Sequence, residues 1–194
     1  MAVSRSMSLG HTAMGPKASA KLAATLRLTK VTSLTISNNP IGDGAMVELL
    51  EGLKDVGLIS LSISNARVGV SSAGKLAELL SSATKFRAAV NCLTLDMNGI
   101  FGELYSNGDV NEADKFASDC DAFLAALKGS NIVTLSLQKT GIGPITLHKL
   151  AISLPAVVTS INCLANQFGD AYLAILLNVA IRIQLAKDTV HIQG

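Results

Sequence analysis

The hydrophobic positions of this chain recur in a fixed order. The stretch SLTISNNPIGDG, residues 33–44, shows the order in five slots: Leu34, Ile36, Asn39, Ile41 and Gly42. Alternating apolar residues are typical of a β-strand with one buried face, and the Asn, Pro and Gly residues that follow favour a turn. A stripe at i, i+3, i+4 and i+7 then predicts a helix with one buried side, and it consists of Met46, Leu49, Leu50 and Leu53.

The same five slots occur six times along the chain. The other copies are Met7, Leu9, Thr12, Met14 and Gly15; Leu61, Ile63, Ala66, Val68 and Gly69; Leu93, Leu95, Asn98 and Ile100, with the glycine displaced to Gly102; Leu135, Leu137, Thr140, Ile142 and Gly143; and Ile161, Cys163, Asn166, Phe168 and Gly169. The intervals between first slots are 27, 27, 32, 42 and 26 residues, and a weak seventh strand is expected at Val190 and Ile192. A unit of this size cannot bury its own apolar faces, so successive units are expected to stack.

This pattern resembles the leucine-rich repeat family, in its ribonuclease-inhibitor-like branch with repeats of about 28 residues. The resemblance covers nearly the whole chain and departs from the family at Cys163, which replaces a Leu, and at the Asn slot of three copies. It implies an α/β solenoid, a right-handed β-α superhelix of about six repeats. Parallel strands would line its concave face and helices its convex face, with residues 1–194 forming a single domain.

The Asn slot predicts contacts between successive turns. An Asn side chain can donate its amide hydrogens to backbone carbonyls of the adjacent turn. Thr12 and Thr140 can each supply one such donor, whereas Ala66 supplies none. We therefore expect a weaker connection at the turn that contains Ala66.

The interval from Leu93 to Leu135 is 15 residues longer than the 27-residue spacing. Because the preceding helix end stays in register, the extra residues form an acidic insertion at about 102–117, GELYSNGDVNEADKFA. Read from Asp109, the EF-hand spacing fails at Asp114 and at Cys120. We interpret the insertion as a solvated loop leading into a helix, with a metal site as the alternative.

A second insertion, of five residues, falls in SSATKFRAAV and contains Lys85, Phe86 and Arg87. We interpret it as an extension of the preceding helix capped by Phe86. The alternative is a basic and aromatic contact patch.

The resemblance places every second strand residue on a solvent-facing concave surface. This surface is small, rich in hydroxyl groups, nearly uncharged and free of aromatic residues, whereas protein-binding hot spots are enriched in Trp, Tyr and Arg. We therefore expect a modest binding face or one covered by a permanent partner, with the later repeats the better contact region. The candidate protein-binding residues are Thr35, Ser37, Asn38, Ser62, Ser64, Asn65, Thr94, Asp96, Met97, Ser136, Gln138, Lys139, Asn162 and Leu164.

Composition bears on the binding partners and the cellular location of the protein. The net charge of +2 is too small to predict binding to nucleic acid or to a membrane surface, and the apolar run at 171–186 is too short to span a bilayer. We interpret that run as a buried helix face. Three cysteines without metal-ligand spacing favour reduced thiols in the cytoplasm. Because residues 1–42 lack Asp and Glu, an organelle transit peptide is the alternative to a first repeat.

The sequence offers no catalytic constellation. The three histidines, His11, His148 and His191, occupy different repeat slots, and no His neighbours Cys92 in an adjacent strand to activate it. We therefore predict no catalytic residue, cofactor or metal, and a noncatalytic scaffold for protein–protein interaction. The alternatives are a GTPase-activating or other regulatory protein of the same branch, or a structural subunit. Terminal repeats without a polar cap are expected to associate end to end or with other subunits.

Overall fold

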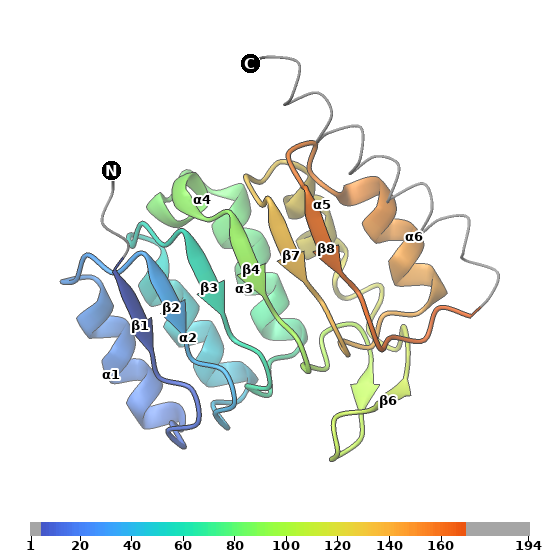
Figure 1. The fold of residues 1–194 in the computed structure, drawn as a ribbon, viewed down its shortest axis with the longest axis horizontal. Helices are drawn as coiled ribbons and strands as arrows, with labels where there is room; N and C mark the ends of the chain where they lie inside the picture. Colours follow the sequence, from blue (N-terminus) through green and yellow to red (C-terminus); the bar gives the residue numbers. More distant parts are fainter. Residues whose placement is uncertain (1–4, 170–194) are drawn as a thin grey trace.

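A parallel β-sheet forms the frame of the protein (Figure 1). The computed structural model describes residues 5–169, in which the fold is α/β with a six-stranded sheet in the order β1-β2-β3-β4-β7-β8. Every neighbouring pair in this sheet is parallel. The strands are β1 (Ser6–Ser8), β2 (Ser33–Thr35), β3 (Ser60–Ser62), β4 (Cys92–Thr94), β7 (Thr134–Ser136) and β8 (Ser160–Asn162).

Helices cover one face of this sheet. Figure 1 shows them behind the strands, and α1 contacts α2, α2 contacts α3, α3 contacts α5 and α5 contacts α6. Among the residues that the structure describes, no helix covers the other face. The helices are α1 (Pro16–Leu26), α2 (Asp43–Leu53), α3 (Val70–Ser81), α4 (Lys85–Ala89), α5 (Asp121–Lys128) and α6 (Pro144–Ser153).

The first slots of the sequence pattern lie side by side. The strand register pairs each with the next along the row Met7, Leu34, Leu61, Leu93, Leu135 and Ile161. The four central members of the row are fully buried, so the predicted pairing of these strands is confirmed. We number the six strand-and-turn units 1 to 6 after β1, β2, β3, β4, β7 and β8. The strand expected at Val190 and Ile192 and the helix face expected at 171–186 lie outside the described residues.

Each strand ends in the same backbone conformation. The residue four positions after the first slot has a positive φ, between 48° and 58°, in all six units: His11, Asn38, Asn65, Met97, Lys139 and Ala165. This left-handed conformation is uncommon for residues other than Gly and Asn. Its repetition turns the chain out of the sheet at one height in every unit.

The bend asparagines connect neighbouring turns, as predicted. In unit 4, the Asn98 amide nitrogen donates to the carbonyls of Ile63 and Leu95, both at 2.9 Å. Its Oδ1 accepts from the backbone N–H groups of Ala66 and Val68, both at 3.0 Å. Ala66 itself supplies no side-chain bond to the turn of unit 2, so the prediction for that connection stands, but Asn98 of the following unit holds the backbone N–H groups of Ala66 and Val68.

Two aspartates connect neighbouring units at their helix ends. Asp43, the first residue of α2, accepts hydrogen bonds from the backbone N–H groups of Gly69, Ser71 and Ser72 at the start of α3. Asp114 accepts in the same way at the start of α6, from Gly143, Ile145 and Thr146. Neither helix has a side-chain cap of its own, so the preceding unit provides it.

The acidic insertion forms a β-hairpin. β5 (Glu103–Leu104) and β6 (Val110–Glu112) pair antiparallel, which corrects the interpretation of this stretch as a solvated loop. The turn has a positive φ of 84° at Gly108. The hairpin leaves the sheet through a tight passage at Gly102, where a side-chain Cβ would lie 2.8 Å from the Gly141 carbonyl oxygen. The smaller insertion forms a separate helix, α4, rather than an extension of α3, and Phe86 is fully buried.

Candidate functional site

The uncovered face of the sheet carries the predicted binding residues. Most of them are half-buried, and Asn65 and Leu164 are exposed. Ser37 is a correction, because it is only 8% exposed and its hydroxyl is bonded to Ser62 Oγ at 2.9 Å and to the Ser64 backbone N–H at 3.1 Å. The half-buried members are Thr35, Asn38, Ser62, Ser64, Thr94, Asp96, Met97, Ser136, Gln138, Lys139 and Asn162.

Several of these side chains are already bonded to one another across the strands. The Ser136 hydroxyl donates to Asp96 Oδ1 at 2.6 Å, and the Gln138 backbone N–H donates to the same oxygen at 2.8 Å. The Asn162 amide donates to Ser136 Oγ at 3.0 Å. Such lateral bonds order the face before any partner arrives, which lowers the entropy cost of binding.

A second line of contacts follows the left-handed slot through units 1 to 3. The Asn65 amide donates to Asn38 Oδ1 at 3.1 Å, and the Asn38 amide nitrogen lies 3.0 Å from His11 Nε2. In unit 5 the same slot holds Lys139, which forms an ion pair with Asp109 of the insertion at 2.7 Å. The residues in this slot therefore form a line across the carboxyl ends of the strands, and this line reaches the hairpin at Asp109.

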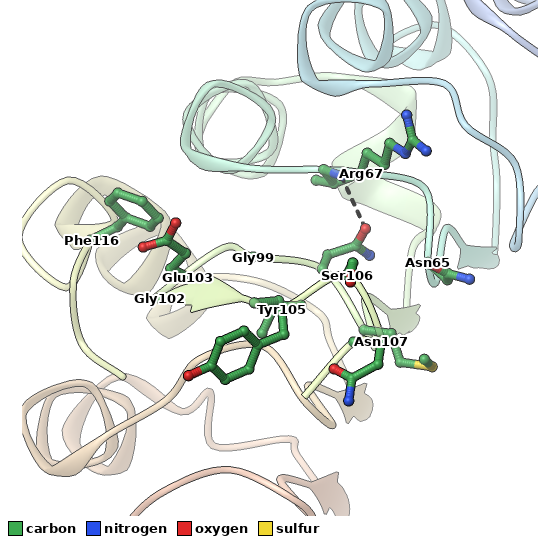
Figure 2. A pocket seen from close by; sticks show the side chains of 14 residues that line it. Asn65, Arg67, Gly99, Gly102, Glu103, Tyr105, Ser106, Asn107 and Phe116 are labelled. Carbon is green, nitrogen blue, oxygen red and sulfur yellow. Dashed lines mark hydrogen bonds between the residues drawn. The ribbon is translucent and has the colours of Figure 1, made fainter. Parts of the chain in front are cut away.

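A recess of about 530 Å³ lies between the carboxyl ends of β3 and β4 and the hairpin (Figure 2). Its wall comes from three segments: the turn after β3, the turn after β4, and the hairpin with Phe116. The lining residues are Asn65, Arg67, Val68, Met97, Asn98, Gly99, Gly102, Glu103, Leu104, Tyr105, Ser106, Asn107, Gly108 and Phe116. The floor is fixed by the five hydrogen bonds of Asn98, one of which Figure 2 draws as a dashed line.

The hairpin side of the recess is fixed as well. The Tyr105 backbone N–H donates to the Asp109 carbonyl at 2.8 Å, and the Asp109 side chain is held by Lys139. The ion pair and its hydrogen bond lower the pKa of Asp109. The Gln167 amide also donates to the Val110 carbonyl at 2.9 Å, which attaches the hairpin to unit 6. The recess is therefore preformed.

Two residue types that are enriched in binding hot spots, Tyr and Arg, line this recess. Tyr105 is 57% exposed, and Arg67 has a left-handed φ of 58°. Residue types at the strand positions did not reveal either of them, because both lie in turns. The usable sequence signal was Tyr105, an aromatic residue two positions before the Asn-Gly turn of an insertion.

The acidic residues of the insertion are largely engaged. Lys115 pairs with Glu103 and Glu112, and both pairs raise the pKa of Lys115. Asp114 caps α6, and Asp121 pairs with Lys149 at 2.6 Å. Within residues 5–169, no three His, Cys, Asp or Glu side chains gather into a group that could hold a metal ion.

The thiols of Cys120 and Cys163 are poor nucleophiles because their surroundings disfavour the thiolate. Burial, with a smaller contribution from nearby aspartates, raises the pKa of Cys120 to about 12, and burial and Asp96 raise that of Cys163 to about 12. Both thiols are therefore protonated at neutral pH.

The described part of the chain contains no helix with the length and apolar character needed to cross a bilayer.

Comparison of the sequence with models of known protein families gave no match, and comparison with curated proteins gave no significant one.

Proposed function

We propose that this protein is a noncatalytic scaffold for protein–protein interaction, with the solenoid architecture of a ribonuclease-inhibitor-like leucine-rich repeat protein. The observation that carries the proposal is the strand register. It aligns one apolar residue per unit in a single row, which leaves the alternate residues of all six strands on one uncovered face. A broad, ordered surface of this kind suits a polypeptide partner better than a small substrate.

The recess strengthens this proposal by adding what the strand face lacks. The face itself offers small hydroxyl and amide groups, which give complementarity but few strong anchors. Tyr105 stands at one border of this face with more than half of its surface exposed. A partner lying across the carboxyl ends of the strands would contact the amides of Asn38 and Asn65 and then reach Tyr105.

Arg67 is the observation that keeps a GTPase-activating role as a second candidate. It is exposed on the rim and forms no ion pair with any described residue. An Arg supplied to a bound nucleotide can stabilise the charge of phosphoryl transfer. A GTP turnover assay with small GTPases, comparing the native protein with Arg67→Ala, separates this role from simple binding.

The scaffold proposal is tested by blocking the uncovered face without disturbing the core. Thr94 lies on β4 in the middle of the face, and its side chain forms no hydrogen bond with any residue that the structure describes, so Thr94→Arg adds bulk and charge there. Ser81→Arg is the matched control, because Ser81 is exposed at the end of α3 on the helix side. Both variants should show the circular dichroism and melting temperature of the native protein.

We expect the native protein and Ser81→Arg to retain the same proteins from an extract of the native source. Thr94→Arg should retain them at least about tenfold less, as expected when an interface centre is overpacked. Equal retention by all three proteins would contradict the use of this face.

A further inference from the structure

The side chains that line the recess offer a ligand more hydrogen-bond donors than acceptors, and this imbalance indicates what the recess holds. We propose that the recess receives an acidic side chain, Asp or Glu, from the polypeptide partner. This inference rests on the proposed scaffold function and specifies the chemistry of one of its contacts.

Arg67 carries the unpaired charge of the recess. It is exposed in the turn after β3, and its guanidinium forms no ion pair or hydrogen bond with any residue that the structure describes. A guanidinium presents five N–H donors in a planar fork, which matches the two oxygens of a carboxylate. Figure 2 shows this side chain directed away from Tyr105 and Glu103. It therefore stands clear of the carboxylate in the lining and can turn about its long side chain onto a ligand.

Three neutral side chains add donors. The hydroxyls of Tyr105 and Ser106 are bonded to none of the described residues, and both side chains are exposed. Asn65 donates one amide hydrogen to Asn38 Oδ1 at 3.1 Å, which leaves its second amide hydrogen for a ligand. A carboxylate offers about four lone-pair sites, so it can accept from the Arg67 guanidinium and from neutral donors at the same time.

The side-chain acceptors of the lining are largely engaged. The Glu103 carboxylate pairs with Lys115, and Asn107 Oδ1 accepts from the Asp109 backbone N–H at 3.1 Å. The Asn98 side-chain oxygen accepts from two backbone N–H groups of the turn after β3. A ligand that brings donors would have to displace these contacts, whereas a ligand that brings acceptors leaves them in place.

The charges around the recess favour a ligand with one negative charge over a ligand with two. Glu103 and Glu112 share Lys115, so this cluster keeps an excess negative charge that repels a phosphate dianion more strongly than a carboxylate. Figure 2 shows Glu103 and Asn65 on opposite sides of the recess. A carboxylate held by Arg67 and Asn65, both in the turn after β3, therefore lies away from Glu103.

The recess has the size and position to receive an internal side chain of the partner. Its volume of about 530 Å³ falls within the range of roughly 300–1,000 Å³ for ligand pockets, which leaves room for one side chain and its adjoining backbone. A partner lying across the carboxyl ends of the strands continues past the recess. We therefore assign the carboxylate to a side chain rather than to a chain terminus.

The proposal is tested with small probes on the full chain. The ¹⁵N-labelled protein is titrated with N-acetyl-glutamate amide, with its neutral isostere N-acetyl-glutamine amide, with N-acetyl-phosphoserine amide, and with N-acetyl-alanine, whose carboxylate is a chain terminus. We expect the glutamate probe to shift the amide signals of Asn65, Arg67 and Ser106. It should bind about fivefold more tightly than the glutamine probe, as a charge-assisted contact requires, and more tightly than the other two probes.

Variants locate the contact. Arg67→Gln should bring binding of the glutamate probe to the level of the glutamine probe. Arg27→Gln is the matched control, because Arg27 is also exposed and forms no ion pair within residues 5–169 but lies at the end of α1, and it should bind as the native protein does. Both variants should keep the native circular dichroism spectrum.

Four results would overturn the proposal. They are equal affinity for the glutamate and glutamine probes, signal shifts confined to residues outside the recess, native binding by Arg67→Gln, and tighter binding of the phosphoserine or the alanine probe.

The outcome is independent of the test of the scaffold function. The probe titration needs no partner, so its failure leaves the uncovered face as a binding surface. Conversely, equal retention in the Thr94→Arg experiment would leave a measured preference of the recess for carboxylates without a polypeptide shown to supply them.

Discussion

Neighbouring units of this protein are joined in two different ways, and the two alternate along the sheet. Units 1 and 2, 3 and 4, and 5 and 6 are joined by Asn39, Asn98 and Asn166, each bonded to backbone groups of the preceding turn. Units 2 and 3, and 4 and 5, are joined by Asp43 and Asp114, each bonded to the N-terminus of the next helix. Among the described residues, units 2 and 4 supply both connections, unit 6 supplies the asparagine connection, and odd-numbered units receive them.

The difference between the two junctions is physical as well as positional. The central asparagine, Asn98, is neutral and 1% exposed, so its bonds satisfy buried backbone groups that water cannot reach. The aspartates are half-buried and charged, and they act on helix N-termini, where negative charge is favourable. We therefore expect the asparagine junctions to be the stronger and to be independent of pH, and the Asp43 junction to depend on ionisation.

The largest effect is expected for Asn98→Ala. The substitution leaves the buried N–H groups of Ala66 and Val68 and the carbonyl of Ile63 without their partner, and each unsatisfied buried group costs about 1–3 kcal/mol. We expect the free energy of unfolding to fall by about 3 kcal/mol in urea denaturation. Asn111→Ala, at an exposed hairpin position, is the control and should change it by less than about 0.5 kcal/mol. An equal fall in the free energy of unfolding for Asn98→Ala and Asn111→Ala would contradict a special role for the asparagine junction.

A smaller effect is expected for Asp43→Ala. The variant loses a charged helix cap, and losses of this kind are typically about 1 kcal/mol. Asp43→Asn should retain part of the stability, because the amide oxygen can still accept from the α3 backbone. A loss larger than that of Asn98→Ala would reverse the proposed order of the junctions.

The aspartate junction should also weaken in acid. Burial opposes ionisation of Asp43, but hydrogen bonds from the Ser72 hydroxyl and the Gly69 and Ser72 backbone outweigh it and lower the pKa of Asp43 below its ordinary 3.8. A depressed pKa contributes stability above the unfolded value, and that contribution is lost as pH falls through the folded value. Urea midpoints measured from pH 6 to pH 2.5 should therefore converge for the native protein and Asp43→Asn below about pH 4. Parallel curves throughout would contradict the charged cap.

The smallest effect distinguishes the two aspartate junctions from each other. At the first, the Ser72 hydroxyl donates to the Asp43 carbonyl oxygen at 3.1 Å and to its carboxylate. At the second, the equivalent hydroxyl of Thr146 is buried without a partner among the described residues. We expect Ser72→Ala to cost about 0.5 kcal/mol and Thr146→Val to be neutral or stabilising in the same denaturation assay. A larger loss from Thr146→Val would indicate a partner for that hydroxyl.

The sheet could be predicted from the sequence because its signal is periodic. Leu34, Leu61 and Leu93 fill the same slot of successive units, and a buried row tolerates few other residue types. The bend contacts of Asn98 followed from side-chain chemistry. The sequence did not show that Asn98 of the following unit binds the backbone N–H of Ala66, because no residue near Ala66 indicates this contact.

The recess could not be predicted in the same way, because it depends on where an irregular insertion lies against regular units. Composition described the insertion correctly as acidic, but it did not show that Lys115 and Lys139 engage most of those acids. Likewise, Ser37 occupies a solvent-facing slot in the pattern, yet its hydroxyl is enclosed by bonds to the next strand.

The most direct test of the account is a methyl–methyl NOE spectrum of protein labelled at Leu and Ile. It should connect Leu34 to Leu61, Leu61 to Leu93, Leu93 to Leu135 and Leu135 to Ile161, because parallel neighbouring strands lie about 4.8 Å apart. Contacts from Leu93 to the hairpin residues Leu104 or Val110 in place of Leu135 would contradict the unbroken row on which the binding face depends.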